Sequence, residues 1–110
     1  MTYAQINNMI AGMGLDYAYY QFAEATKTAP PFICFFYSGI DDLYADQTNY
    51  QRIVSLIVEL YTDTKDFVLE SRVESVLSAN GLTYRKTETY IDTEHMQQTV
   101  YEMGVLINGE

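Results

Sequence analysis

Few residues in this 110-residue sequence could carry out covalent chemistry, because it holds one cysteine, Cys34, and one histidine, His95. Nucleophilic catalysis needs a base beside the nucleophile. Cys34 lies in a short apolar run that predicts a buried strand, whereas His95 lies in a polar turn. We interpret Cys34 as a small core residue and His95 as a solvated turn residue, and we expect no catalytic residue.

Two groups of acidic residues could be considered as metal ligands. The first group lies in the turn around the histidine and consists of Asp92, Glu94 and His95. The second group lies in one polar segment and consists of Asp41, Asp42 and Asp46. That segment lacks the glycine and the bidentate glutamate of an EF-hand calcium loop, so we interpret it as a solvated loop. We expect no metal ion and no cofactor.

The net charge of the chain argues against two classes of partner. Fifteen acidic residues against six basic ones give a net charge of −9. Such a surface repels phosphate, which argues against sequence-specific nucleic-acid binding and against an anionic membrane surface. No apolar run is long enough for a membrane span, and the N-terminus does not resemble a signal peptide. The length and the composition, with 48% hydrophobic and 19% charged residues, predict one globular domain over residues 1–110.

The first half of the chain predicts one helix and three strands. Residues 2–13 have apolar residues at helical spacing, with Thr2 as the N-cap and Gly12 and Gly14 at the end. Aromatic and β-branched residues predict strands over 17–23, 32–38 and 50–61. The polar, acidic residues 39–49 predict a loop between the second and third of these strands.

The second half predicts a helix followed by a hairpin. Residues 62–64 offer an N-cap, residues 65–80 have a buried stripe that includes Val73 and Leu77, and Gly81 ends the helix. Residues 82–92 and 97–108 predict two strands around a turn at 93–96. The element order is therefore α-β-β-β-α-β-β, which indicates an α+β fold with a largely antiparallel or mixed sheet and two helices packed on one face.

Two helices of about 10 Å diameter can cover a five-stranded sheet on one face only. The strand over 50–61 nevertheless has apolar residues on both faces, with Ile53, Ile57 and Tyr61 on the second one. We predict that these residues, with Tyr19 of the first strand, contact another subunit. A sheet that curls over its own second face is the alternative.

Several segments resemble a known family over nearly the whole chain. They are "PPFICFFYSG", "VELYTDTKD", "ESRVESVLSANG" and "TYRKTETYIDTEHMQQTVYEMGVLIN". The sequence resembles the tail-terminator, or tail-completion, proteins of phages and prophages of Gram-positive bacteria that have long non-contractile tails. None of these segments is a catalytic motif.

The resemblance implies a structural protein of the virion, at the junction of head and tail, that is assembled in the bacterial cytoplasm. Such a protein forms a ring, commonly a hexamer, on the last ring of the major tail tube protein. It ends tube growth and offers a docking surface to the head-tail connector, and DNA passes through its hole without sequence-specific binding. Asp41, Asp42 and Asp46 would line that hole and repel the DNA, or they simply face solvent.

Three other functions remain as alternatives. A head-side connector or adaptor protein would use a similar small domain. A small metal-dependent hydrolase would use Asp92, Glu94 and His95. An inhibitor that mimics nucleic acid would need its acidic residues on one face, whereas those of this chain are scattered along the sequence.

Overall fold

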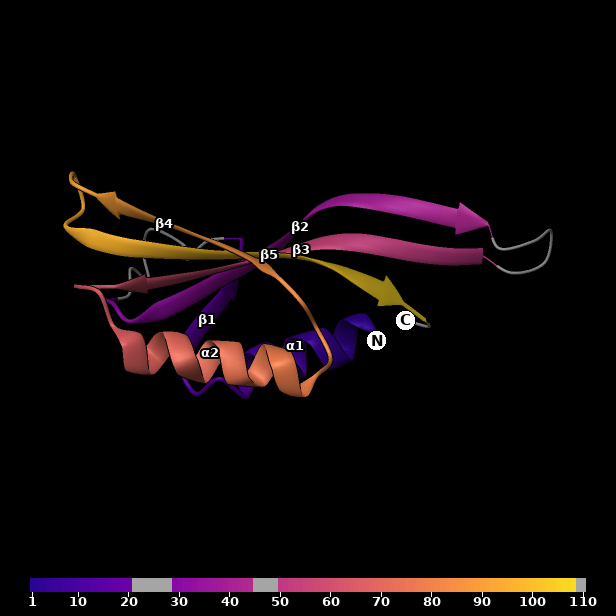
Figure 1. Cartoon of the computed structure of the whole chain (residues 1–110), viewed down its shortest axis with the longest axis horizontal. Helices are drawn as coiled ribbons and strands as arrows, with labels where there is room; N and C mark the ends of the chain where they lie inside the picture. The colour runs from indigo at the N-terminus through magenta and orange to yellow at the C-terminus, as the bar shows by residue number, and fades with distance from the viewer. Residues whose placement is uncertain (21–28, 45–49, 109–110) are drawn as a thin grey trace.

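The computed structural model describes residues 1–20, 29–44 and 50–108, with the backbone alone described for 39–44 and for 50 and 51. Its element order is α-β-β-β-α-β-β, as predicted. The five strands form one mixed sheet in the order β1-β2-β3-β5-β4, in which β1 runs parallel to β2 and all other pairs are antiparallel. Both helices lie on the same side of this sheet (Figure 1).

The first helix, α1, spans Tyr3–Ala11. The Thr2 hydroxyl accepts a hydrogen bond from the Gln5 amide, and the Gln5 side chain accepts one from the Thr2 amide, which together form a capping box. Gly12 is the C-cap residue. The predicted N-cap and the predicted end of this helix are therefore confirmed, and Ile6 and Ile10 are fully buried against the sheet.

The first strand, β1, spans Asp16–Tyr19 and pairs with the start of β2. Gly14, which precedes it, has a φ of 77°, a conformation that favours glycine. The prediction extended this strand to residue 23, and residues 21–23 lie outside the described part of the chain.

Strands β2 (Phe32–Tyr44) and β3 (Tyr50–Thr62) form a long hairpin, so the prediction of a loop over residues 39–49 is wrong for 39–44. The pairing continues after a bulge between Tyr37 and Gly39, as far as the Tyr44–Tyr50 pair. The bulge absorbs Ser38 and lets the ladder resume, so that backbone pairing outweighs the polar composition of this segment.

The second helix, α2, spans Phe67–Ala79 and begins later than predicted. Its N-cap is Asp66, whose carboxylate accepts a hydrogen bond from the Leu69 amide at 3.0 Å, and not a residue of 62–64. Val73 and Leu77 of the predicted stripe are fully buried. Gly81 has a φ of 74°, as expected for the residue that ends a helix.

Strands β4 (Arg85–Ile91) and β5 (Met96–Ile107) form the predicted closing hairpin. Successive residues of β5 alternate between the two sides of the sheet. Tyr101, Met103 and Val105 are buried on the helix side, whereas Glu102 and Leu106 are exposed on the other side. The hydrophobic core thus lies between the helices and one side of the sheet, where Val54, Leu56, Val58 and Leu60 of β3 are fully buried.

Candidate functional site: the open face of the sheet

The side of the sheet that faces away from both helices is called here the open face. No helix of the described residues lies on it (Figure 1). The register of the strands places an apolar centre there, contributed by β2, β3 and β5. Its apolar members are Phe32, Cys34, Phe36, Ile53, Ile57, Val100 and Leu106.

The predicted contact residues Ile53, Ile57 and Tyr61 all lie on the open face. Ile57 is 7% exposed, and Ile53 and Tyr61 are half-buried. The rings of Tyr61 and Phe32 stack across the β2–β3 pair with their centroids 4.8 Å apart. Neighbouring side chains of the sheet thus shelter part of this surface, and Leu106 is the most exposed of its large apolar members.

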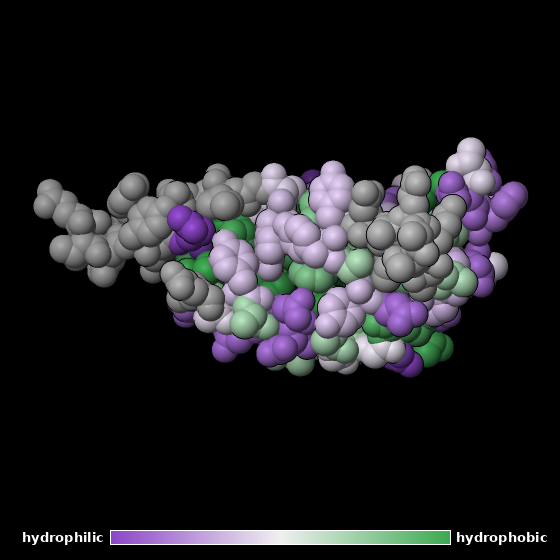
Figure 2. Space-filling model, turned by 180° about the vertical axis from the view of Figure 1, so that it is seen from behind, coloured by the Kyte–Doolittle hydropathy of each residue, from purple (hydrophilic) through white to green (hydrophobic). Residues whose placement is uncertain are grey.

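Tyr19, the fourth predicted contact residue, lies on the other side of the sheet. It pairs with Phe35 and packs edge-on against that ring at 5.3 Å. Its hydroxyl accepts a hydrogen bond from the Tyr37 amide at 3.3 Å, at the edge of the sheet. Figure 2 shows the molecule from behind, where residues of weakly hydrophilic character (pale lilac) lie around hydrophobic ones (green). Tyr19 is 53% exposed. Because it lies on the helix side of the sheet, it belongs to a surface separate from the open face.

A polar cluster of three residues interrupts the open face. The Tyr61 hydroxyl donates a hydrogen bond to Glu59 at 3.0 Å, and the Gln98 amide donates to Glu59 at 3.3 Å and to Tyr61 at 2.9 Å. Burial raises the pKa of the Glu59 carboxyl, and the hydrogen bond from Tyr61 offsets only part of this. Burial and the nearby Glu59 charge raise the pKa of Tyr61 as well. Glu59 is thus a half-buried carboxylate that is solvated by neutral groups.

A second polar cluster joins α2 to β4 on the helix side and is called here the ion cluster. The Lys86 ammonium lies 2.7 Å from both Glu70 and Glu74, and Lys65 contacts Glu70 at 2.9 Å and also Glu88. Burial alone would raise the pKa of Glu70, but the hydrogen bonds from Lys86 and Lys65 outweigh it and hold the pKa below its ordinary value. The ion cluster therefore fastens the second helix to the edge of the sheet.

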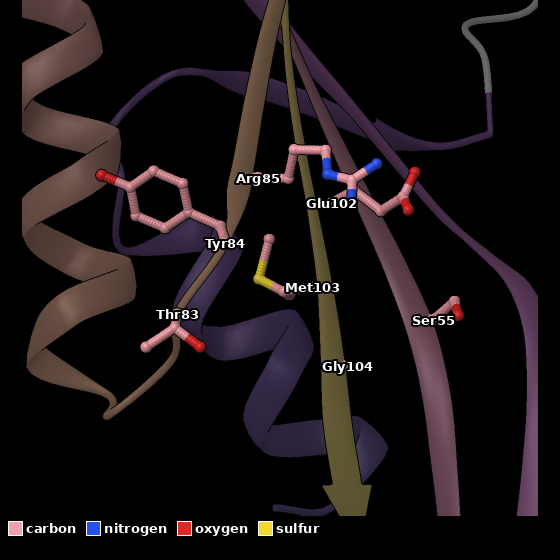
Figure 3. Close-up of a pocket in the computed structure, with 7 residues that line it drawn as sticks. All are labelled: Ser55, Thr83, Tyr84, Arg85, Glu102, Met103 and Gly104. Atoms are coloured by element: carbon pink, nitrogen blue, oxygen red, sulfur yellow. The ribbon is translucent and has the colours of Figure 1, made fainter.

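A shallow hollow of about 360 Å³ lies where β4 joins the edge of β5. It is lined by Ser55, Thr83, Tyr84, Arg85, Glu102, Met103 and Gly104. In Figure 3, Tyr84 points toward α2, whereas Arg85 and Glu102 extend together to the other side, toward β3. Arg85 and Glu102 are cross-strand partners, so this hollow forms the polar border of the open face.

The residues that were considered for catalysis and metal binding are not brought together. Cys34 is buried in β2, and His95 is exposed in the turn between β4 and β5. Within the described residues, no group of three His, Cys, Asp or Glu side chains could hold a metal ion. In the same part of the chain, no helix is long and apolar enough to cross a membrane.

The three acidic residues predicted to line a hole are only partly placed. Asp41 and Asp42 lie in β2, at the register positions opposite Ile53 and Arg52, and not in a loop. Asp46 lies outside the described residues. That these residues face a hole stays a prediction.

The comparisons with known proteins bear on the fold. No protein-family model matches the sequence, and a search of curated proteins gives no match. The structure is similar to a chain of the solved virion of a native gene transfer agent particle, with a TM-score of 0.61. The two chains are 14% identical, and the match covers 97% of this chain and 91% of that one. This likeness shows the fold.

Proposed function

We propose that this protein is a structural component of a phage-type virion. The observation that carries this proposal is the likeness to a chain of a gene transfer agent virion, since it covers nearly the full length of both chains. A likeness over the whole length means that the same arrangement of helices and strands serves as a building block of a virus-like particle in the other protein.

The open face supports an assembly role of this kind. A sheet normally buries both faces or keeps one of them polar. Here the second face presents Phe36, Ile53 and Leu106, and Leu106 is 43% exposed. An apolar surface on a protein this small marks a contact with a partner.

Within the virion, we propose that the chain acts as a tail terminator, as the sequence resemblance implies. It would form a ring, commonly of six copies, on the last ring of the tail tube protein. It would end tube growth and present a docking surface to the head connector. DNA would pass through the hole, and an acidic lining that includes Asp41, Asp42 and Asp46 would repel it. In this assembly Ile53, Ile57 and Tyr61 contact a neighbouring copy, and Tyr19 contributes from the edge of the sheet, where it accepts the hydrogen bond from the Tyr37 amide.

Negative-stain images of the protein, alone and mixed with the tube protein of its virion, test this proposal. We expect rings, or tubes of limited length that carry a cap at one end. An Ile53→Asp variant should fold and lose both features, because it places a charge on the open face. The matched control is Thr93→Asp, in the exposed β4–β5 turn, which should behave as the wild type. A strictly monomeric protein that leaves tube length unchanged would contradict the proposal.

A further inference from the structure

The outward surface of the two helices carries almost no charge. The exposed residues of α1 are Ala4, Gln5, Asn7, Asn8 and Ala11. The exposed residues of α2 include two serines, Ser71 and Ser75, and one charged residue, Arg72. Solvent-facing helix surfaces are ordinarily rich in charge, and this chain has 15 acidic residues to place. Depletion of charge is typical of the centre of a protein–protein interface.

Two apolar side chains project from the same surface. Phe67 and Val68, at the start of α2, are 72% and 73% exposed. Their spacing to Ser71, Arg72 and Ser75 places all five on one face of the helix. The outward face of α2 therefore presents two large apolar residues, short polar residues and a single guanidinium.

Arg72 occupies the junction of the two helices. An added Cβ at Gly14, just after α1, would lie 3.5 Å from its Nη1 atom. Among the described residues, Arg72 makes no ion pair, whereas Lys65 and Lys86 are held in the ion cluster. Arg72 is thus a cation that remains available to a partner.

The open face offers the complementary arrangement. Glu59 is the carboxylate that the central strand β3 contributes to this face, whereas Glu102 lies on β5 between Ile57 and Arg85. Glu59 receives hydrogen bonds from Tyr61 and Gln98, which are both neutral. A carboxylate has about four acceptor positions, so capacity remains for a bidentate guanidinium.

The helices and the open face lie on opposite sides of the same sheet (Figure 1). A layer of helices placed on the open face would complete the sheet on both sides, which is the usual arrangement of a mixed sheet.

We propose that the helix layer of one copy packs on the open face of the next copy, with Arg72 of one paired to Glu59 of the other. This inference rests on the proposed ring function and names its subunit contact. The two patches differ, so the contact is heterologous, and a heterologous contact that closes gives a ring.

Charge reversal tests this contact, with assembly mass measured by light scattering over a range of concentrations. Arg72→Glu and Glu59→Arg should each raise the concentration for half-assembly by about 10-fold or more, because each places like charges in contact. An equimolar mixture of the two variants should assemble, since each helix layer then meets a sheet of opposite charge. The double variant should assemble on its own.

Controls separate this contact from general effects. Glu94→Arg, in the exposed β4–β5 turn, changes the net charge by the same amount as Glu59→Arg and should leave assembly unchanged. Thermal unfolding of each variant reports whether it folds. If Glu59→Arg does not fold, Glu59→Gln replaces it and should weaken assembly by an amount that Arg72→Gln does not increase further.

The failing outcomes are distinct. Wild-type rings that persist in Arg72→Glu would overturn the contact and leave the proposed function in place. Rescue of Glu59→Arg by wild-type protein as effectively as by Arg72→Glu would indicate that two open faces meet, because both partners keep an unchanged Glu59, and this also overturns the contact. A wild-type chain that stays monomeric at every concentration, alone and with the tube protein, and leaves tube length unchanged would overturn the proposed function and the contact together.

Discussion

The two polar clusters on opposite sides of the sheet contain similar side chains, but the hydrogen-bond partners of their carboxylates differ. In the ion cluster, Glu70 and Glu74 receive the ammonium of Lys86, and Glu74 also accepts a hydrogen bond from the Tyr101 hydroxyl at 2.8 Å. On the open face, the described residues give Glu59 hydrogen bonds from a tyrosine and a glutamine. Each cluster thus pairs a carboxylate with a tyrosine, but within the part of the chain that the structure describes the cation belongs to the ion cluster.

The pKa values of the three glutamates differ in the same way. Hydrogen bonds from lysine hold the pKa of Glu70 and Glu74 below the ordinary value in spite of burial, whereas burial raises the pKa of Glu59. A carboxylate whose ionised form is stabilised within the chain contributes to folding. A half-buried carboxylate without a cation costs stability, and it is available to a cation from another copy.

Removal of the central cation should have the largest effect. Replacement of Lys86 by Met keeps the apolar stem but leaves the buried Glu70 with Lys65 alone. We expect the free energy of unfolding to fall by about 2–3 kcal/mol, because a buried carboxylate that loses one of its two cations is only partly compensated. Urea denaturation at neutral pH measures it.

Arg85→Met is the matched control for that variant. Arg85 is adjacent in the sequence, but it is exposed and extends to the other side of the sheet (Figure 3). Its replacement should change stability by no more than about 0.5 kcal/mol. Equal losses for the two variants would show that the ion cluster does not fasten α2 to β4.

Removal of one hydroxyl from each cluster should have a smaller effect. Tyr101 is fully buried, so Tyr101→Phe removes from Glu74 a hydrogen bond that is made on the buried side of the carboxylate, at a cost of about 1.5 kcal/mol. Tyr61 is half-buried and water can replace its hydroxyl, so Tyr61→Phe should cost about 0.5 kcal/mol. The pair is measured by thermal unfolding of dilute protein. A larger loss in Tyr61→Phe would reverse the comparison between the two sides.

Local sequence signals predicted most of the fold. The capping residue Thr2, the glycine after α2 and the alternation of β5 each depend on a few neighbouring residues, and the structure agrees with all three. The extension of β2 to Tyr44 was missed because pairing with Tyr50 and its neighbours stabilises it, and the composition of the segment itself is polar. The N-cap Asp66 was missed because 62–64 offers equally good capping side chains.

The candidate site was predicted in part. The alternation of β3 placed Ile53, Ile57 and Tyr61 on one face, and this needs only the period of a strand. Tyr19 was assigned to the same surface, but its side depends on the register between β1 and β2, which the sequence of β1 does not fix. The outer surface of α2, with Arg72 as its one exposed charged residue, was visible in the sequence as Ser71, Arg72 and Ser75 at helical spacing. That this surface lies on the opposite side of the sheet from the open face required the structure (Figure 1).

The smallest effect on stability is expected for Glu59→Gln, and its sign differs from that of Glu74→Gln. The folded-state pKa of Glu59 is above its ordinary value of 4.5, so the folded protein binds this proton more readily than the unfolded chain does. Wild-type protein therefore gains stability as pH falls through that raised pKa. The neutral glutamine should make dilute protein slightly more stable at pH 7, and this advantage should vanish by about pH 4.5.

Glu74→Gln is the matched test on the other side of the sheet. Its folded-state pKa lies below 4.5, so ionised Glu74 contributes stability that is present above pH 4.5 and is lost as pH falls through the lowered value. This variant should be less stable at neutral pH, with a difference that shrinks in acid.

Concentrated protein adds the deciding observation, because Glu59→Gln should assemble less well although each copy is more stable. A variant that weakened folding and assembly together would place Glu59 among the groups that hold the monomer, and the contrast between the two clusters would no longer identify the contact between copies.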